Sequence, residues 1–157
     1  MIDTQQRTEE PLKFADAYLI GTKAVLLNNF DPKYARNLKS LQLQTMFFVD
    51  RSEFIMGNNE EDKLLRIIVR LGARWVDFHS SSPTDKTAID DMICALIEAD
   101  FAVEYSLNEN FDQKTIDAYA LSLAQKDIWP FWKEFLTSQT NRMNLHEVDM
   151  PVMNISS

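Results

Sequence analysis

Apolar and polar side chains alternate over three stretches in the first two thirds of the chain, and an apolar-rich stretch precedes them. Alternation at period two is typical of a strand with one buried face, because successive side chains of a strand point to opposite sides of a sheet. The pattern predicts strands over residues 13–29, 40–49, 64–78 and 92–107. Gly21, in the middle of the first stretch, predicts a bulge or bend. Residues 51–62 are mostly polar and end in turn-forming residues, so we expect a connection there.

The third and fourth predicted strands carry opposite charges. Arg66, Arg70 and Arg74 alternate with apolar residues on the third, and Glu98 and Glu104 share one face of the fourth. If the two strands are neighbours, cross-strand ion pairs on a solvated face explain both sets. We therefore expect a wet sheet face on which these arginines meet these glutamates.

The last third of the chain changes to a helical period. Residues 112–124 predict a short amphipathic helix. Pro130 predicts the first turn of a second helix, where its missing N–H would have had no partner anyway, and Asp127 just upstream predicts a carboxylate cap. Residues 145–153 are expected to be extended.

Aromatic side chains gather at the start of this second helix. Their spacing fits an ordinary amphipathic core helix. We expect the following residues to anchor it to the sheet or to an oligomer interface: Trp129, Pro130, Phe131, Trp132 and Phe135.

Four strands followed by helices, without strand–helix–strand alternation, indicate an α+β fold. We expect a four-stranded antiparallel sheet with the C-terminal helices packed on one face. The 157 residues suit one domain with its own core. The expected organisation is a flexible arm over 1–12, a single domain over 13–153 and a short tail over 154–157.

Composition narrows the classes of function. Sixteen Lys and Arg against 24 Asp and Glu give a net charge of −8, which argues against nucleic-acid binding. Three glycines cannot build a phosphate-binding loop, and His79 and His146 are too isolated to suggest a metal site. We therefore expect no cofactor, no metal and no catalytic residues.

The N-terminus and the single cysteine bear on the cellular compartment. Residues 1–10 lack the apolar region of a signal peptide, and no apolar run approaches the roughly 20 residues that span a bilayer. Cys94 lies in an apolar stretch that predicts a buried, inert thiol. We expect a cytoplasmic protein that does not insert into membranes.

The end of the chain resembles the end of the conserved domain of the SecB export chaperones and their SecB-like relatives. Their pattern is an aromatic-Pro-aromatic-x-basic-Glu helix, an Arg-small turn, and an apolar extended segment ending near a proline. It corresponds here to Trp129 through Glu134, then Arg142-Met143, then Leu145 to Val152. With the strand order, the resemblance covers roughly residues 14–152.

The resemblance implies an ATP-independent holding chaperone, a homotetramer built as a dimer of dimers. Long hydrophobic grooves in such proteins receive unfolded polypeptides and preproteins and keep them competent for export. By position, the groove residues of this chain would be Phe30, Tyr34, Leu38, Leu41, Leu43, Leu145, Val148, Met150 and Val152.

The sequence also departs from the classical export chaperone. There, an acidic outer sheet face engages the SecA translocase motor. The first predicted strand here offers no clear carboxylates in the corresponding region. Glu98 and Glu104 are therefore the remaining candidates for a docking face. A divergent SecB-like protein fits better. One alternative is a dedicated chaperone of a toxin–antitoxin system; another, from a different class, is a small-molecule-binding or enzymatic α+β domain.

Overall fold

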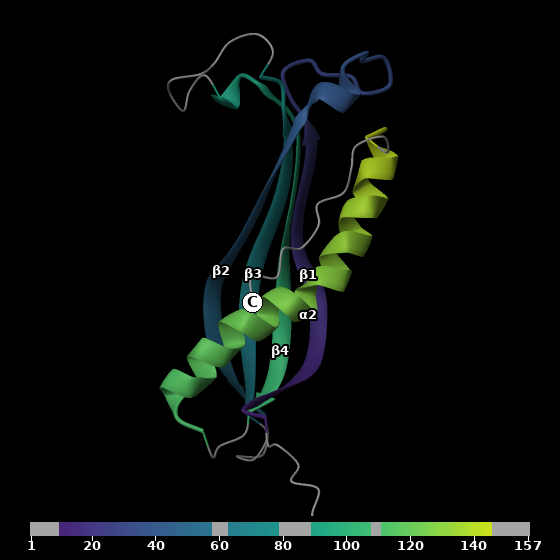
Figure 1. Ribbon diagram of the computed structural model, residues 1–157. Helices are drawn as coiled ribbons and strands as arrows, with labels where there is room; N and C mark the ends of the chain where they lie inside the picture. The colour runs from purple at the N-terminus through teal and green to yellow at the C-terminus, as the bar shows by residue number, and fades with distance from the viewer. Residues whose placement is uncertain (1–9, 58–62, 79–88, 108–110, 146–157) are drawn as a thin grey trace, which may run out of the picture.

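The computed structural model describes residues 10–57, 63–78, 89–107 and 111–145. Four long strands and one long C-terminal helix, α2, account for most of them (Figure 1). The elements are β1 (Leu12–Leu26), a 3-10 turn η1 (Leu38–Ser40), β2 (Gln42–Met56), β3 (Lys63–Val76), β4 (Ile93–Leu107) and α2 (Gln113–Arg142).

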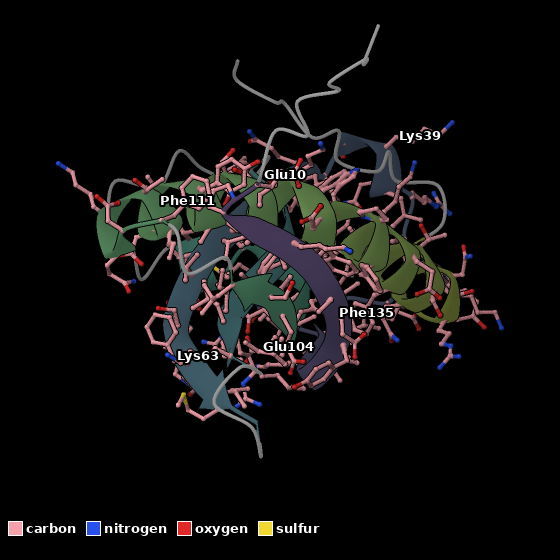
Figure 2. All side chains as sticks on the ribbon, turned by 90° about the horizontal axis from the view of Figure 1, so that it is seen from below. Glu10, Lys39, Lys63, Glu104, Phe111 and Phe135 are labelled. Atoms are coloured by element: carbon pink, nitrogen blue, oxygen red, sulfur yellow. The ribbon has the colours of Figure 1, made fainter. Side chains whose placement is uncertain are left out.

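The four strands form one antiparallel sheet in the order β1-β4-β3-β2. Residues 27–41 carry the chain from β1 across one end of the sheet to β2, so the first two strands become its two edges (Figure 1). Seen along the strands, α2 lies over one face of the curved sheet (Figure 2). The predicted α+β architecture is confirmed.

The core lies between α2 and the two central strands. β3 and β4 are in register so that Ile67 faces Val103 and Val69 faces Phe101, all four of which are buried. The helix contributes every fourth residue to this core, a row that runs along one side of a helix. The row consists of Ile116, Ala120, Ala124, Ile128, Trp132, Leu136 and Thr140.

The two helices predicted for the last third are in fact one helix of 30 residues. Asp112 caps it by accepting a hydrogen bond from the Thr115 N–H at 2.8 Å. Pro130 is therefore inside the helix, and the cap predicted at Asp127 is wrong; that carboxylate instead accepts a hydrogen bond from the Tyr105 hydroxyl at 2.8 Å. A proline removes one helical hydrogen bond and its ring crowds the preceding turn. These effects account for the bend of α2 part way along (Figure 1).

The connection predicted over residues 51–62 is wrong for its first half, because β2 continues to Met56. The register of β2 on β3 shifts by one between Val49 and Arg51, a bulge at Asp50. Odd-numbered side chains face the helix side before the bulge and even-numbered ones after it. Of the bulge or bend predicted at Gly21, the structure shows a bulge, a register shift between Leu19 and Gly21.

Candidate functional site

Eleven large apolar side chains are exposed among the described residues, which is the first pointer to a functional surface. Eight of them lie on the two edge strands: Phe14, Leu19, Ile20 and Leu26 on β1, and Met46, Phe48, Phe54 and Met56 on β2. The others are Tyr34, Leu121 and Phe131. Exposed apolar area therefore concentrates at the edges of the sheet.

The helix-side face of β2 carries a row of apolar side chains, which we call the β2 strip: Leu43, Phe47, Val49, Phe54 and Met56. α2 packs mainly against β1, β4 and β3, so this edge of the sheet extends beyond the main helix contacts. Leu43, Phe47 and Val49 are half-buried against the core, whereas Phe54 and Met56 are 52% and 60% exposed. The strip runs roughly 45 Å along the strand at about 3.3 Å per residue.

Two other elements add apolar side chains that pack partly against the same core. Phe30 and Leu38 come from the connection that leads into β2, and Tyr119 and Leu123 come from the first half of α2. Tyr34, on the same connection, is 74% exposed. Together with the β2 strip, these residues supply an elongated, mostly apolar surface.

The predicted groove residues separate into three groups. Phe30, Leu38 and Leu43 are half-buried and Tyr34 is exposed, so each presents some surface. Leu41 and Leu145 are buried in the core and present almost none. Val148, Met150 and Val152 lie outside the described residues.

Sequence reasoning missed Phe47, Val49, Phe54 and Met56 as members of this surface. Phe54 and Met56 fell in the segment taken for a polar connection. The missed signal was the apolar run from Phe54 to Met56, whose even-numbered side chains face the helix because the bulge reverses the phase of the strand.

The aromatic residues of α2 link the helix to the sheet. The Trp132 and Phe135 rings stack with their centroids 6.1 Å apart, and Phe135 meets Phe101 of β4 edge-on at 6.2 Å. Phe131 lies 6.4 Å from Phe14 of β1. Of the residues expected to act as anchors, Trp132 is buried, Trp129 and Phe135 are half-buried, and Pro130 and Phe131 are exposed.

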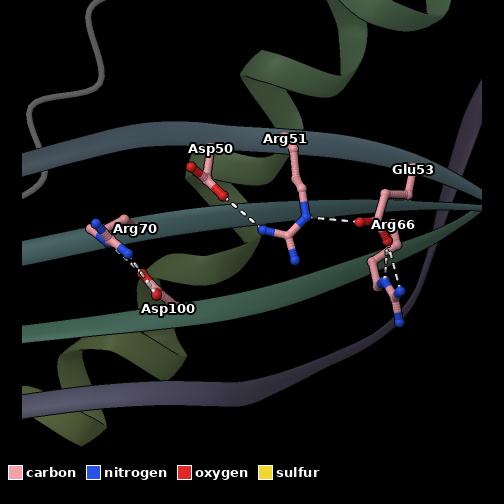
Figure 3. Close-up of polar contacts among 6 residues, drawn as sticks. All are labelled: Asp50, Arg51, Glu53, Arg66, Arg70 and Asp100. Atoms are coloured by element: carbon pink, nitrogen blue, oxygen red, sulfur yellow. Dashed lines mark hydrogen bonds and ion pairs between the residues drawn. The ribbon is translucent and has the colours of Figure 1, made fainter.

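The face of the sheet away from α2, which we call the outer face, carries cross-strand ion pairs (Figure 3). Arg70 donates two hydrogen bonds to Asp100, at 2.7 and 3.0 Å, and Arg66 donates two to Glu53, at 2.7 and 3.2 Å. Hydrogen bonding to these guanidinium groups lowers the pKa of Asp100 and of Glu53 below the ordinary range. Arg51 bridges Asp50 and Glu53 along β2, at 2.8 Å each.

The predicted partners of the arginines were wrong, although cross-strand pairing itself is present. Glu104 accepts a hydrogen bond from the Tyr18 hydroxyl at 2.8 Å, and Arg74 donates to the side chain of Gln44 at 2.6 Å. Within the described chain, the Glu98 carboxylate makes no hydrogen bond or ion pair. Glu98 and Glu104 therefore lie on a face of mixed charge rather than on a continuous acidic surface.

The described residues offer little for metal or thiol chemistry. No group of three or more His, Cys, Asp or Glu side chains among them is placed to hold a metal ion. Cys94 is buried, and burial, with the nearby Asp77 charge, raises the pKa of its thiol, so it stays protonated and unreactive.

In the described part of the chain, no helix has the length and apolar character to cross a membrane.

Comparison with known proteins gives a structural match and no sequence match. No family model matches the chain, and no curated protein does. The chain is similar in structure to the SecB-like chaperone Rv1957 of Mycobacterium tuberculosis, solved in complex with a ChAD peptide from the HigA1 antitoxin, with a TM-score of 0.57. The alignment covers 94% of each chain at 15% sequence identity, so it shows a shared SecB-like fold.

Proposed function

We propose that this protein is a holding chaperone that binds non-native polypeptides without ATP. The observation that carries the proposal is the β2 strip, whose Phe54 and Met56 are more than half exposed beside a core that α2 covers elsewhere. A folded chain gains nothing from leaving such side chains in water, so a partner that covers them is the physical explanation. The likeness to a chaperone solved with a bound peptide supports this interpretation.

The chemistry of the strip suits extended, unfolded clients. Aromatic rings and methionine contribute large apolar area, and methionine adapts to varied side chains. At about 25 cal/mol per Å² of apolar area, covering a few hundred Å² contributes several kcal/mol before the cost of ordering the client. Because β2 is an edge strand, its outward backbone groups are also available to pair with an added strand, whatever the client sequence.

A chaperone dedicated to one antitoxin is the second candidate. It is favoured by one observation, that the structurally similar mycobacterial protein was solved with an antitoxin peptide. A role in export through the SecA motor has less support, because the carboxylates of the outer face are interspersed with arginines and largely bound by them. We also propose that the chain assembles as a homotetramer, in which the open edge of β1 supplies a contact between two copies.

The first experiment asks whether the full chain stops a chemically unfolded, slow-folding protein from aggregating in the absence of ATP. We expect suppression near one chaperone oligomer per client chain. The double variant Phe54→Ser, Met56→Ser should lose at least about half of this activity. Both sites are exposed, so the change in stability should stay within about 0.5 kcal/mol per site.

The matched control is Phe48→Ser, the same change on the same strand but on the outer face. It should leave suppression intact. If the double variant and the control act alike, the β2 strip is not the contact surface. If the wild-type chain protects no unrelated client but protects an antitoxin encoded beside it, the dedicated role replaces the general one.

A further inference from the structure

The outer face holds a hollow on the opposite side of the sheet from the β2 strip. Its volume is about 360 Å³, at the lower end of the roughly 300–1,000 Å³ typical of small-molecule sites. Side chains from three neighbouring strands line it: Gln44 and Met46 of β2, Arg74 of β3, and Leu96 and Glu98 of β4. Gly72 of β3 lies among them.

Gly72 leaves room for the Met46 side chain beside the hollow. A Cβ atom at this position would lie 3.0 Å from the terminal methyl carbon of Met46 and 3.5 Å from Cγ of Glu98. A side chain here would therefore displace the flexible end of Met46 and come into contact with Glu98. A glycine inside a central strand weakens the strand, so its presence is consistent with a need for that space.

Two opposite charges line the hollow without meeting each other. The Arg74 Nε donates to the Gln44 Oε1 at 2.6 Å, which fixes the guanidinium and leaves its two terminal nitrogens without a partner in the described part of the chain. The Glu98 carboxylate makes no hydrogen bond or close ion pair with the described side chains, although Arg70 of β3 is near enough to interact with its charge and Lys23 of β1 stands opposite it in the register. A fixed cation and a carboxylate without a hydrogen-bond donor thus line one partly apolar hollow.

We propose that this hollow binds a small zwitterion with an apolar side chain, of the size of an amino acid or dipeptide. Its carboxylate would bind Arg74, its ammonium group Glu98, and its side chain would pack on Met46 and Leu96. This inference goes beyond the chaperone activity and does not depend on it.

The charges argue against simpler ligands. An inorganic anion would pair with Arg74 but leave Glu98 facing it with like charge. A basic side chain alone would pair with Glu98 and be repelled by Arg74. A metal ion would find one carboxylate where calcium or magnesium needs several oxygen ligands. A ligand that carries both charges satisfies both groups at once.

The test is an NMR titration of the full-length, isotope-labelled protein with the dipeptide leucyl-leucine, both of whose termini are free. We expect saturable shifts of the backbone amides of Met46, Gly72 and Glu98 at dipeptide concentrations below roughly 10 mM. Glu98→Gln and Arg74→Gln should each weaken binding at least about tenfold, the loss expected when a charge-assisted contact is removed. Acetylating the amine or amidating the carboxylate of the dipeptide should have the same effect.

The matched control is Glu104→Gln, a carboxylate on the same strand and face but outside the hollow. It should bind as the wild-type chain does. Gly72→Val should abolish binding by filling the hollow. The proposal fails if no saturable shifts occur, if doubly blocked leucyl-leucine binds as well as the free form, or if the shifts map to the β2 strip. The last outcome would leave the chaperone proposal standing.

Discussion

Tyr105 connects the sheet to the middle of the helix through one hydrogen bond. Its ring is fully buried and meets Phe14 edge-on, and its hydroxyl donates to Asp127 at 2.8 Å. Burial first, and then the bond to the Asp127 carboxylate, raise the pKa of the Tyr105 hydroxyl well above its usual range. The folded chain therefore holds this proton more tightly than the unfolded chain does.

This difference predicts a specific loss of stability in alkali. A group whose pKa is raised on folding contributes stability below its unfolded pKa, and that contribution is lost as the pH rises above it, here above about pH 10. Tyr105→Phe should cost about 1 kcal/mol near neutral pH, since it removes one buried hydrogen bond. It should also make the free energy of unfolding fall less steeply above pH 10, as measured by urea titration at a series of pH values.

The control for this prediction is Tyr34→Phe, because Tyr34 is 74% exposed. That variant should match the wild-type chain at every pH. An equally steep alkaline decline in the wild-type chain and in Tyr105→Phe would show that another group is responsible.

At the scale of the elements, α2 has to fit a curved sheet, and Pro130 gives it a bend (Figures 1 and 2). Replacing an interior proline by alanine stabilises a free helix by about 3 kcal/mol. We expect Pro130→Ala to stabilise the folded chain by much less than that, because a straighter helix would fit Trp132 and Phe135 less well onto β4. Urea unfolding of the two full-length chains measures the difference.

Lys133→Ala provides the comparison, because Lys133 is an exposed position of the same helix. Its substitution should change the free energy of unfolding by about 0.5 kcal/mol or less. A peptide of residues 113–142 carrying Pro130→Ala should meanwhile gain helical circular dichroism over the native peptide. A gain near the full 3 kcal/mol in the folded chain would mean that the packing does not require the bend.

The elements also show what the sequence can and cannot predict. Alternation located the last three strands, because one face of the sheet is buried along most of its length, and the first strand was located by its apolar residues. It failed after Val49, where a single extra residue at Asp50 reverses the phase, and this hid Phe54 and Met56 from the predicted surface. The helix was divided in two because Pro130 suits a first turn equally well, and only the fold shows that the preceding turns continue into it.

For a related reason, the sequence could not predict the partners of the outer-face arginines. Alternation assigns a residue to a face, but the register between strands decides which residue it meets. Arg70 pairs with Asp100 through the register of β3 on β4, and Arg66 pairs with Glu53 through the register of β2 on β3 after the bulge at Asp50. The hollow at Gly72 depends on the same registers.

At the scale of the whole molecule, both edges of the sheet are open in a single chain, and they differ. β2 has its apolar strip next to the helix, which we assign to clients. β1 exposes Phe14, Leu19, Ile20 and Leu26, and its unpaired backbone can hydrogen-bond to another strand. An edge this long and apolar is a pairing site unless it is covered. We propose that a second copy of the chain covers it, as one contact of the proposed tetramer.

Leu19→Lys tests this assignment, because Leu19 is 43% exposed near the centre of β1 and a buried, unpaired lysine is costly at an interface. We expect sedimentation velocity to show the wild-type chain as an oligomer and the variant as a smaller species at the same concentration. Leu121→Lys, at a 58% exposed position on α2, should leave the oligomer unchanged. If the Leu19 variant dissociates yet still suppresses aggregation through the β2 strip, the two edges have separate roles. If it keeps the wild-type mass, the copies meet elsewhere and β1 becomes a second surface for clients.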